Sequence, residues 1–267
     1  MKQFKVVERI EADPSVLYYQ EHLARYRFSD TFVRRGNVLD IATGTGYGSE
    51  YLSRHPDVMV VGVDVDLPSL RAASVTYRDQ PIRFVAGDGC FLPFGDGCFS
   101  TIVTLETIEH IADDAKYVNE LNRVLELNGA CVISTPNRLY SESIGRSNPF
   151  HMREYTEEEF VRLLRSTFPS VKLYYQGFRE SHYSKVQAYT TDIQQKKRLL
   201  NPIARFVVDR IYRPLRKFIP AEITNSAIRR FLRVSYPQPA SLDIVISDVS
   251  PREASVFIGV CRRTQAC

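Results

Sequence analysis

The segment Val38–Leu52, VLDIATGTGYGSEYL, constrains the fold of this chain more than any other stretch. A short apolar run precedes glycines at alternate positions, Gly44, Gly46 and Gly48, and a helical pattern follows them. Glycines directly after a strand allow a sharp turn and let a ligand approach the backbone closely. The following helix presents free N–H groups and the positive end of its dipole. The pattern therefore favours an α/β protein with a nucleotide-like ligand.

The same alternation of strand and helix continues along the chain. Apolar, β-branched runs predict strands at 37–42, 58–63, 82–86, 99–104, 131–135, 171–175 and 256–261. Helical patterns fall at 14–32, 47–54, 67–76, 114–125 (closed by Gly129) and 156–167, the last with a capping box of Thr156 and Glu159. Continuously apolar strands that alternate with helices predict a parallel sheet covered on both faces. Its ligand site should lie at the carboxyl ends of the strands.

Composition and charge narrow the class of protein further. The chain has 267 residues, 44% hydrophobic and 25% charged, which suits one large α/β domain or two small ones. No apolar run approaches the roughly 18 residues that span a bilayer, and the N-terminus has no secretory pattern. The cysteines are odd in number, five, without C-x-x-C spacing, which argues against disulfides or a zinc knot. We therefore expect a cytoplasmic protein.

One basic segment stands out from a mildly acidic body. Residues 192–236 hold eleven Lys or Arg and three acids, a net charge of +8 that leaves −4 for the rest. Apolar residues recur there at helical spacing, so we predict that 177–250 is a helical insertion before the last strand. It is expected to act as a lid over the acceptor. Peripheral contact with an anionic membrane, contact with a phosphate-bearing acceptor, and a plain solvated face are the alternatives.

The identity of the nucleotide-like ligand follows from two carboxylates. Asp64 ends the second strand, where a carboxylate can accept hydrogen bonds from both hydroxyls of a ribose. A phosphate-binding P-loop sequence is absent, and Ser49 stands where the dinucleotide fingerprint needs Gly or Ala. Asp40, four residues before Gly44, would repel a phosphate but suits a cationic ligand. S-adenosylmethionine carries a sulfonium and an ammonium group and no phosphate.

At this point the motifs resemble a known family. The pattern Asp40-x-x-x-Gly44-x-Gly46-x-Gly48 resembles motif I of the class I S-adenosylmethionine-dependent methyltransferases, with Ala42 where the widest pattern has Gly. Phe99–Thr104, followed by LETIEHI, resembles their fourth strand and the substrate-facing loop after it, and LNRVLELNGACVISTPN resembles their helix-turn-strand unit. EHLARY and NPFHMREYT resemble a bacterial group associated with glycan and natural-product pathways. The resemblance implies a seven-stranded Rossmann-like sheet with only the last strand antiparallel, and an N-terminal helix over the cofactor.

The resemblance also implies a domain layout and a set of cofactor-binding residues. A single domain, 1–267, would comprise a cap at 1–33, a core at 34–176 and 251–263, and the insertion. Asp64 would bind the ribose and Asp88 the adenine amino group, while Tyr18 and Tyr26 of the cap face the methionine end or pack within the helix. The full set is Tyr26, Asp40, Ala42, Gly44, Gly46, Tyr47, Asp64, Val65, Gly87, Asp88, Gly89 and Glu106.

The acceptor chemistry rests on two histidines. His110 follows Glu106 and Glu109 at the predicted active edge, and His151 precedes a capped helix. A hydroxyl acceptor needs its proton removed by a base or by a metal. We therefore predict His110, His151 and Glu109 as catalytic. Glu106, Glu109, His110 and His151 also resemble a divalent-metal set of some O- and RNA 2′-O-methyltransferases, and a structural role for all of them is the remaining alternative.

Three functions follow from these residues. The first is O-methylation of a sugar, glycolipid or secondary metabolite with S-adenosylmethionine. The second is metal-assisted RNA 2′-O-methylation, although no recognised RNA-binding module is present and nucleic acid is not the expected partner. The third is a cofactor-binding protein of the same fold without catalysis, against which the intact glycine turn and Asp64 argue.

Overall fold

The computed structural model describes residues 17–145, 148–178, 244–249 and 254–264. The chain divides into two compact units, Met1–Gly177 with Ile244–Cys267, and Phe178–Asp243. The described residues lie almost entirely in the first unit, which contains the glycine turn. The basic segment 192–236 and most of the predicted helical insertion lie outside the described residues.

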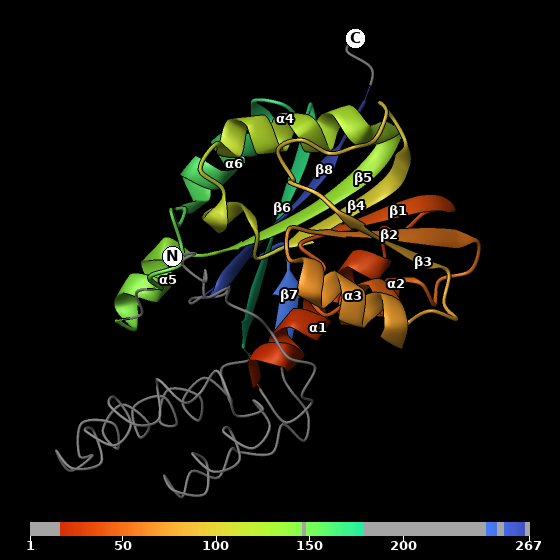
Figure 1. The fold of residues 1–267 in the computed structure, drawn as a ribbon. Coiled ribbons are helices and arrows are strands. Elements are labelled where there is room, and N and C mark those ends of the chain that lie inside the picture. The colour runs from red at the N-terminus through yellow and green to blue at the C-terminus, as the bar shows by residue number, and fades with distance from the viewer. Residues whose placement is uncertain (1–16, 146–147, 179–243, 250–253, 265–267) are drawn as a thin grey trace, which may run out of the picture. The chain divides into compact units, whose positions relative to one another are not determined.

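The first unit is built on one sheet in the order β3-β2-β1-β4-β5-β8-β6-β7. Neighbours among β1 to β5 are parallel, and β8 runs antiparallel to both β5 and β6 (Figure 1). The strands are β1 (Gly36–Ile41), β2 (Val58–Asp64), β3 (Ile82–Ala86), β4 (Phe99–Leu105), β5 (Leu125–Pro136), β6 (Ser170–Phe178), β7 (Ile244–Ser247) and β8 (Val256–Arg262). The helices are α1 (Leu17–Asp30), α2 (Tyr47–Leu52), α3 (Leu67–Thr76), the 3-10 turn η1 (Ile108–His110), α4 (Asp114–Val124), α5 (Arg138–Ser143) and α6 (Glu157–Arg165).

The predicted number of strands was wrong by one. The described part of the sheet has eight strands, and the additional one is β7 at the edge. Its four residues, Ile244–Ser247, fall inside the range 177–250 that we predicted to be helical. A four-residue run is too short to show a period, so the long helical pattern before it dominated the prediction. Gly177 and Phe178 likewise belong to β6.

The boundary between α4 and β5 also differs from the prediction. Helix α4 ends at Val124, and Leu125 already has extended backbone and pairs with Phe99 of β4. A register shift between Phe99 and Thr101 follows, and Asn128 adopts a positive φ of 64°. Gly129 therefore lies within the strand and does not close the helix. A Cβ on Gly129 would lie 2.7 Å from the Leu125 side chain and 2.9 Å from the Glu126 carbonyl oxygen, so the strand has no room for a side chain there.

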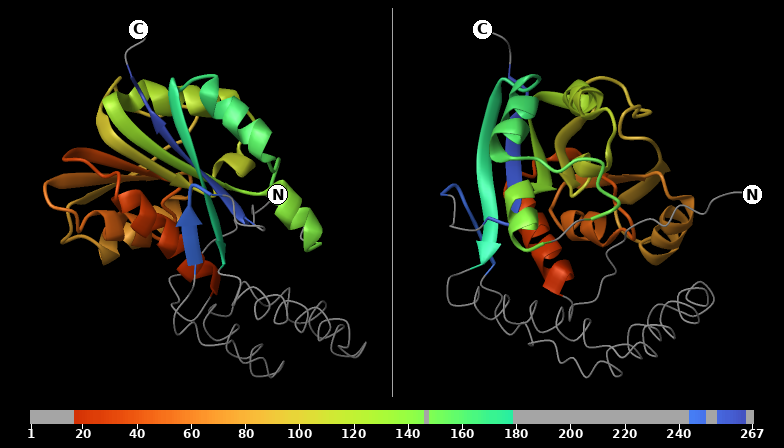
Figure 2. Two further views of the ribbon diagram at one scale, coloured as in Figure 1. Left: turned by 180° about the vertical axis from the view of Figure 1, so that it is seen from behind. Right: turned by 90° about the vertical axis from the view of Figure 1, so that its left-hand side faces the viewer.

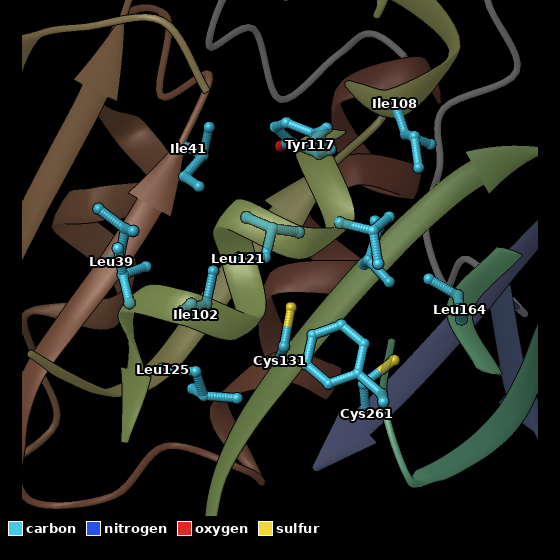
Figure 3. Packing of buried hydrophobic residues seen from close by; sticks show 14 of the residues in the cluster. Leu39, Ile41, Ile102, Ile108, Tyr117, Leu121, Leu125, Cys131, Leu164 and Cys261 are labelled. Carbon is cyan, nitrogen blue, oxygen red and sulfur yellow. The ribbon is translucent and has the colours of Figure 1, made fainter. Parts of the chain in front are cut away.

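The two faces of the sheet have different helical covers. Helices α4 and α6 lie along one face, whereas α1, α2 and α3 lie along the other (Figures 1 and 2). Alternate residues of β1 divide accordingly: Leu39 and Ile41 join the core beneath α4 and α6, and Val38 joins the core beneath α1 and α2. Figure 3 shows Leu121 of α4 gathered with Ile102 and Cys131 of the strands. Asp40, on the same strand face as Val38, therefore points toward α1 and α2.

Side-chain caps mark where three of the helices begin. The capping box at the start of α6 is present in both directions between Thr156 and Glu159. Asp66 and Asp113 cap α3 and α4 through their side chains. Helix α5 and the turn η1, which follow the carboxyl ends of β5 and β4, were not predicted. Because both are short, neither contains enough turns to establish a helical period.

Candidate active site

The glycine turn between β1 and α2 has an unusual backbone. Ala42, Gly44 and Gly46 all adopt the left-handed conformation, with φ of 60°, 55° and 84°. Gly46 occupies the N-cap position of α2, and a Cβ on it would contact Phe84 and Ala73 at 2.9 and 3.0 Å. A Cβ on Gly44 would meet nothing within 4 Å. The turn is thus packed behind Gly46 and open at Gly44, which suits a ligand that lies against the backbone.

Gly48 serves a different purpose from the other two glycines. A Cβ at this position would lie 1.9 Å from Cζ of Tyr26, a residue of α1. The ring of Tyr26 therefore occupies the space that any side chain at position 48 would need. This contact packs α1 closely against the glycine turn.

Asp40 holds the turn from within the protein. Its carboxylate is fully buried and accepts hydrogen bonds from the hydroxyls of Thr43, Ser49 and Tyr26 at 2.8, 2.6 and 3.0 Å. Burial raises the pKa of Asp40 to about 6, although these hydroxyls oppose the rise. The sequence suggested direct attraction of a cationic ligand, but this carboxylate has no exposed surface in the folded chain. Its contact partners are the hydroxyls, and its charge acts on the site only through space.

Asp64 lies beside the turn, as the spacing predicted. Its Oδ2 atom accepts the Gly44 N–H at 2.8 Å, and its Oδ1 atom accepts the Asp66 N–H at 2.9 Å. A carboxylate offers about four lone-pair positions, so two bonds leave capacity for ribose hydroxyls. Val65, the next residue, is 72% exposed. The carboxyl ends of β1 and β2 therefore form one continuous open edge.

The turn after β3 extends this edge. Gly87 donates its N–H to the Asp64 carbonyl at 3.1 Å, and the exposed Asp88 accepts the Cys90 N–H through Oδ1 at 2.8 Å. A Cβ on Gly89 would lie 2.4 Å from the Tyr117 ring, so glycine is required there for packing. Asp88 is thus presented at the surface next to the Asp64 strand end.

Helix α1 supplies a buried polar cluster that the sequence reasoning only partly identified. The Tyr47 hydroxyl is hydrogen-bonded to Nδ1 of His22, and the rings of His22, Tyr26 and Tyr47 pack edge to face. Burial, and then the charge of Arg25, lowers the pKa of His22 well below its ordinary value, so this imidazole is neutral. Tyr26 and Tyr47 were predicted at the cofactor, whereas His22 and Arg25 were not singled out. Their signal was the EHLARY segment, which the sequence analysis used as a family resemblance without assigning a role to either residue.

Glu106 lies at the end of β4, in the strand-end row that the sequence predicted. It adopts a positive φ of 52°, and its carboxylate accepts the Ser134 hydroxyl at 2.9 Å. The guanidinium of Arg25 is 4.0 Å from the other carboxylate oxygen. Glu106 therefore faces α1 and the glycine-turn side of the sheet.

Glu109, His110 and His151 form a separate cluster. Their ligating atoms all lie within 4.8 Å of one another, and the two imidazole rings meet edge to face with centroids 4.9 Å apart. Glu109 is fully buried and its Oε2 accepts the Thr135 hydroxyl at 3.1 Å. Burial, and then the neighbouring Glu106 charge, raises the pKa of Glu109 well above its ordinary value. Glu109 thus lies inside the protein, and the two histidines are half-buried.

The two histidines differ in which ring nitrogen is free. His110 donates its Nδ1–H to the Phe150 carbonyl at 3.0 Å, which leaves a lone pair on Nε2. His151 has both nitrogens engaged, Nδ1 with Glu154 at 2.6 Å and Nε2 with the Asn148 amide at 2.8 Å. Because Asn148 accepts the Phe150 N–H through its oxygen, its amide group is the donor to His151. Among the catalytic residues predicted from the sequence, His110 alone has a basic nitrogen without a partner in the described chain.

The same geometry tests the predicted metal site. The cluster contains Glu109, His110 and His151, whereas Glu106, the fourth predicted ligand, is outside it. Within the described residues, the uncommitted ligand atoms are Glu109 Oε1 and His110 Nε2. Both nitrogens of His151 are already hydrogen-bonded. Two free ligand atoms do not make a divalent-metal site, so the arrangement does not fit a bound metal.

With the fold and the site in place, comparison with known proteins is informative. Residues 39–133 match the family model described as a methyltransferase domain. One similar solved structure is phosphoethanolamine N-methyltransferase 2 from Haemonchus contortus in complex with S-adenosyl-L-methionine. The match covers 92% of this chain and 53% of that protein's chain, with a TM-score of 0.56 and 15% sequence identity. The fold is that of a class I methyltransferase. At this identity the structural likeness extends to the fold alone.

Sequence relatives agree with this fold. A Mycolicibacterium smegmatis protein named "Probable S-adenosylmethionine-dependent methyltransferase" is 36% identical over 135 residues, 49% of this chain and 50% of its own length. The demethylmenaquinone methyltransferase of a Roseiflexus species is 42% identical over 98 residues, 36% of this chain and 41% of its own. The chain thus spans about half the length or less of these relatives. The family match, over residues that include the glycine turn, and these relatives make the chain similar to S-adenosylmethionine-dependent methyltransferases.

Proposed function

We propose that this protein transfers a methyl group from S-adenosylmethionine to a hydroxyl of a sugar, glycolipid or related secondary metabolite. The cofactor assignment is supported by the left-handed turn at Ala42, Gly44 and Gly46, with Asp64 beside it and Asp88 at the next strand end. The single observation that carries the choice of a hydroxyl acceptor is the free Nε2 of His110.

The role of each residue follows from the direction of proton flow. S-adenosylmethionine, when bound, supplies an electrophilic methyl group on a positively charged sulfur. His110 Nε2 accepts the hydroxyl proton as the acceptor oxygen attacks, and the Phe150 carbonyl keeps the opposite nitrogen protonated. The base must hold the acceptor oxygen about 3 Å from the methyl carbon, in line with the bond that breaks. His151 packs against the base and orients it, because both its own nitrogens are occupied.

The surface around His110 favours an acceptor with an apolar portion. Phe150, whose carbonyl binds His110, is 43% exposed, and Met152 on the same loop is 65% exposed. Leu139 on α5 is 59% exposed. A polar base beside exposed apolar side chains suits an amphiphilic hydroxyl compound better than a nucleic acid strand, whose backbone calls for basic residues. A glycolipid satisfies both conditions.

The decisive experiment separates binding from chemistry. We expect His110→Ala to abolish methyl transfer from radiolabelled S-adenosylmethionine to a panel of glycolipid and phenolic hydroxyl acceptors. Its calorimetric affinity for S-adenosylhomocysteine should stay within about twofold of the native protein. His55→Ala is the matched control, because His55 precedes β2 at the opposite edge of the sheet.

Two results would contradict the proposal. Full turnover by the His110→Ala variant would show that His110 is not the catalytic base. If the native protein did not bind S-adenosylhomocysteine, the cofactor assignment would be wrong. Methyl transfer to RNA that requires added Mn²⁺ or Mg²⁺ would favour the alternative RNA 2′-O-methyltransferase. Cofactor binding with no transfer to any acceptor tested would favour a non-catalytic protein of this fold.

A further inference from the structure

Asn148, on the loop that carries His151, contacts both groups that hold the His110 ring. Its Oδ1 atom accepts the Phe150 N–H at 3.1 Å, and the carbonyl of the same Phe150 accepts the Nδ1–H of His110. Its amide nitrogen lies 2.8 Å from Nε2 of His151, whose ring packs edge to face against His110. One amide group is therefore bonded to both neighbours of the base.

The orientation of the Asn148 amide is fixed by its partners. The Phe150 N–H can only donate, so it requires the amide oxygen, and the NH2 group is left to face His151. A flipped amide would place two donors against each other at Phe150 and would lose that hydrogen bond. In the observed orientation Asn148 donates, and Nε2 of His151 accepts.

The tautomer of His151 follows from that donation. Because Nε2 accepts a hydrogen bond, it carries no proton, and the single ring proton is on Nδ1. Oε1 of Glu154 accepts this Nδ1–H at 2.6 Å, from a side chain that is 14% exposed. His151 is thus a neutral ring whose plane is set from both sides. It places no positive charge beside His110 when His110 takes up the acceptor proton.

The backbone of the loop is attached to η1 independently of the Asn148 side chain. The N–H groups of Met152 and Arg153 both donate to the carbonyl of Glu109, at 2.8 and 3.2 Å. The His151 N–H donates to the backbone carbonyl of Asn148 at 3.1 Å, a bond that any residue at this position provides. A change of the Asn148 side chain is therefore expected to affect the two imidazole rings more than the path of the loop.

We propose that Asn148 is a positioning residue for methyl transfer, which sets the Nδ1–H tautomer of His151 and holds the Phe150 carbonyl against His110. The inference rests on the proposed function, since it requires His110 to act as the base. Asn148 acts through these two neighbours. Without its amide, the His151 ring and the Phe150 carbonyl lose a common support, and the base loses its fixed direction.

The first test removes only one of the two side-chain bonds. Asn148→Asp keeps an oxygen for the Phe150 N–H but replaces the donor to His151 with an acceptor. We expect this variant to lower kcat by about tenfold or more, while its calorimetric affinity for S-adenosylhomocysteine stays within about twofold of the native protein. Asn119→Asp is the matched control, because the exposed Asn119 of α4 likewise accepts a hydrogen bond, from Thr167. It should change neither quantity.

The second test observes the tautomer in the native protein, with no acceptor or cofactor present. Long-range 1H–15N NMR spectra at about pH 8, where ordinary imidazoles are neutral, distinguish Nδ1–H from Nε2–H rings. The His151→Gln variant identifies the His151 resonances. We expect His151 in the Nδ1–H form, which is the less common form in water. Asn148→Asp should shift it away from this form, and Asn119→Asp should not.

The outcomes separate this inference from the proposed function. An Nε2–H ring at His151 in the native protein would overturn the role of Asn148 without reference to any variant. Native kcat in Asn148→Asp would overturn it as well, while His110 could still be the base. If the native protein binds S-adenosylhomocysteine but His110→Ala retains full turnover, the proposed base fails and the positioning role fails with it. A lower kcat with unchanged cofactor affinity and an altered His151 tautomer would support the inference.

Discussion

Asp40 shows how a residue that the sequence marked for ligand binding acts as a structural support. Three hydroxyls surround its carboxylate, and burial places its pKa at about 6 instead of 3.8. At a pH between these two pKa values, Asp40 is protonated in the folded protein but has lost its proton in the unfolded chain. The free energy of unfolding contributed by Asp40 therefore falls as the pH rises through this window.

We predict that Asp40→Asn removes this pH dependence. The difference in unfolding free energy, variant minus native, should rise by up to about 3 kcal/mol as the pH rises from 4 to 7. Urea denaturation at one-unit pH intervals measures it, with the exposed Asp79→Asn as a control that should give a flat difference. An equally flat difference for Asp40→Asn would show that this carboxylate titrates normally in the folded protein.

Asp64 combines two roles at one side chain. It accepts the Gly44 N–H and so shapes the turn, and its remaining lone pairs face the open edge where we expect the ribose. Asp64→Ala should weaken S-adenosylhomocysteine about tenfold or more by calorimetry, because charge-assisted hydrogen bonds contribute roughly 1.5–3 kcal/mol. Asp79→Ala serves as the matched surface control. An unchanged affinity would remove Asp64 from the ribose role.

At the residue scale, spacing identified which side chains share the site but not which atoms are free. Asp40 and Asp64 lie near the carboxyl ends of β1 and β2, and Glu106 directly follows β4, so the sequence placed them at one edge. The sequence had no means of showing that three hydroxyls bind the Asp40 carboxylate, since the Tyr26 contact depends on the packing of α1. The engagement of both His151 nitrogens depends likewise on the path of the loop from Asn148 to Glu154.

At the scale of elements, the contact between α1 and α2 depends on one missing side chain. Gly48 provides the space that the Tyr26 ring occupies, and a Cβ there would overlap it. We predict that Gly48→Ala lowers the free energy of unfolding by roughly 1–3 kcal/mol or more. Gly95→Ala, whose Cβ would meet only Cys98 at 3.5 Å, should change it by less than about 0.5 kcal/mol.

A double-mutant cycle tests the cause of that loss. Tyr26→Phe retains the ring carbons that overlap, so the penalty at position 48 should persist in that background. Tyr26→Leu removes them, and Gly48→Ala should then cost much less. An equal cost of Gly48→Ala in the native and Tyr26→Leu backgrounds would assign the effect to helix propensity or another neighbour.

Elements with strong patterns were predicted well, and weak ones were missed for physical reasons. The bounds of α3 and β3 agree with the structure, because caps and turns punctuate both of them. The start of β5 was missed because the chain leaves α4 directly into a strand at Leu125, with no glycine between them. Strand β7 was missed because an edge strand of four residues gains its stability from pairing, which sequence period does not reveal.

At the scale of the whole molecule, the strand order explains why the candidate residues at the strand ends lie together. Strands β1, β2, β3 and β4 run parallel, so their carboxyl ends present Ala42, Asp64, Asp88 and Glu106 at a single edge. None of the helices in the described ranges is long and apolar enough to cross a membrane. The fold class was predictable because alternation of strands and helices leaves few other topologies.

We predict that cofactor binding stabilises the protein as a unit. S-adenosylhomocysteine at 100 times its dissociation constant should raise the free energy of unfolding by about 2.7 kcal/mol. Thermal denaturation should show a rise in Tm of several degrees, and Asp64→Ala, which we expect to bind about tenfold more weakly, should lose about half of it at the same ligand concentration. If Tm did not rise at ligand concentrations that saturate the calorimetric titration, the ligand would not be binding preferentially to the folded state.

The attachment of α1 also bears on how the cofactor is exchanged during turnover. Tyr26 bonds Asp40, His22 bonds Tyr47, and Arg25 bonds Gln176, so one helix is fastened to the turn, to α2 and to β6. A gate that swung away on every catalytic cycle would have to break all of these bonds together. We therefore expect α1 to stay in place as a fixed wall, and a bound cofactor to be exchanged past the exposed residues Ala42, Val65 and Asp88.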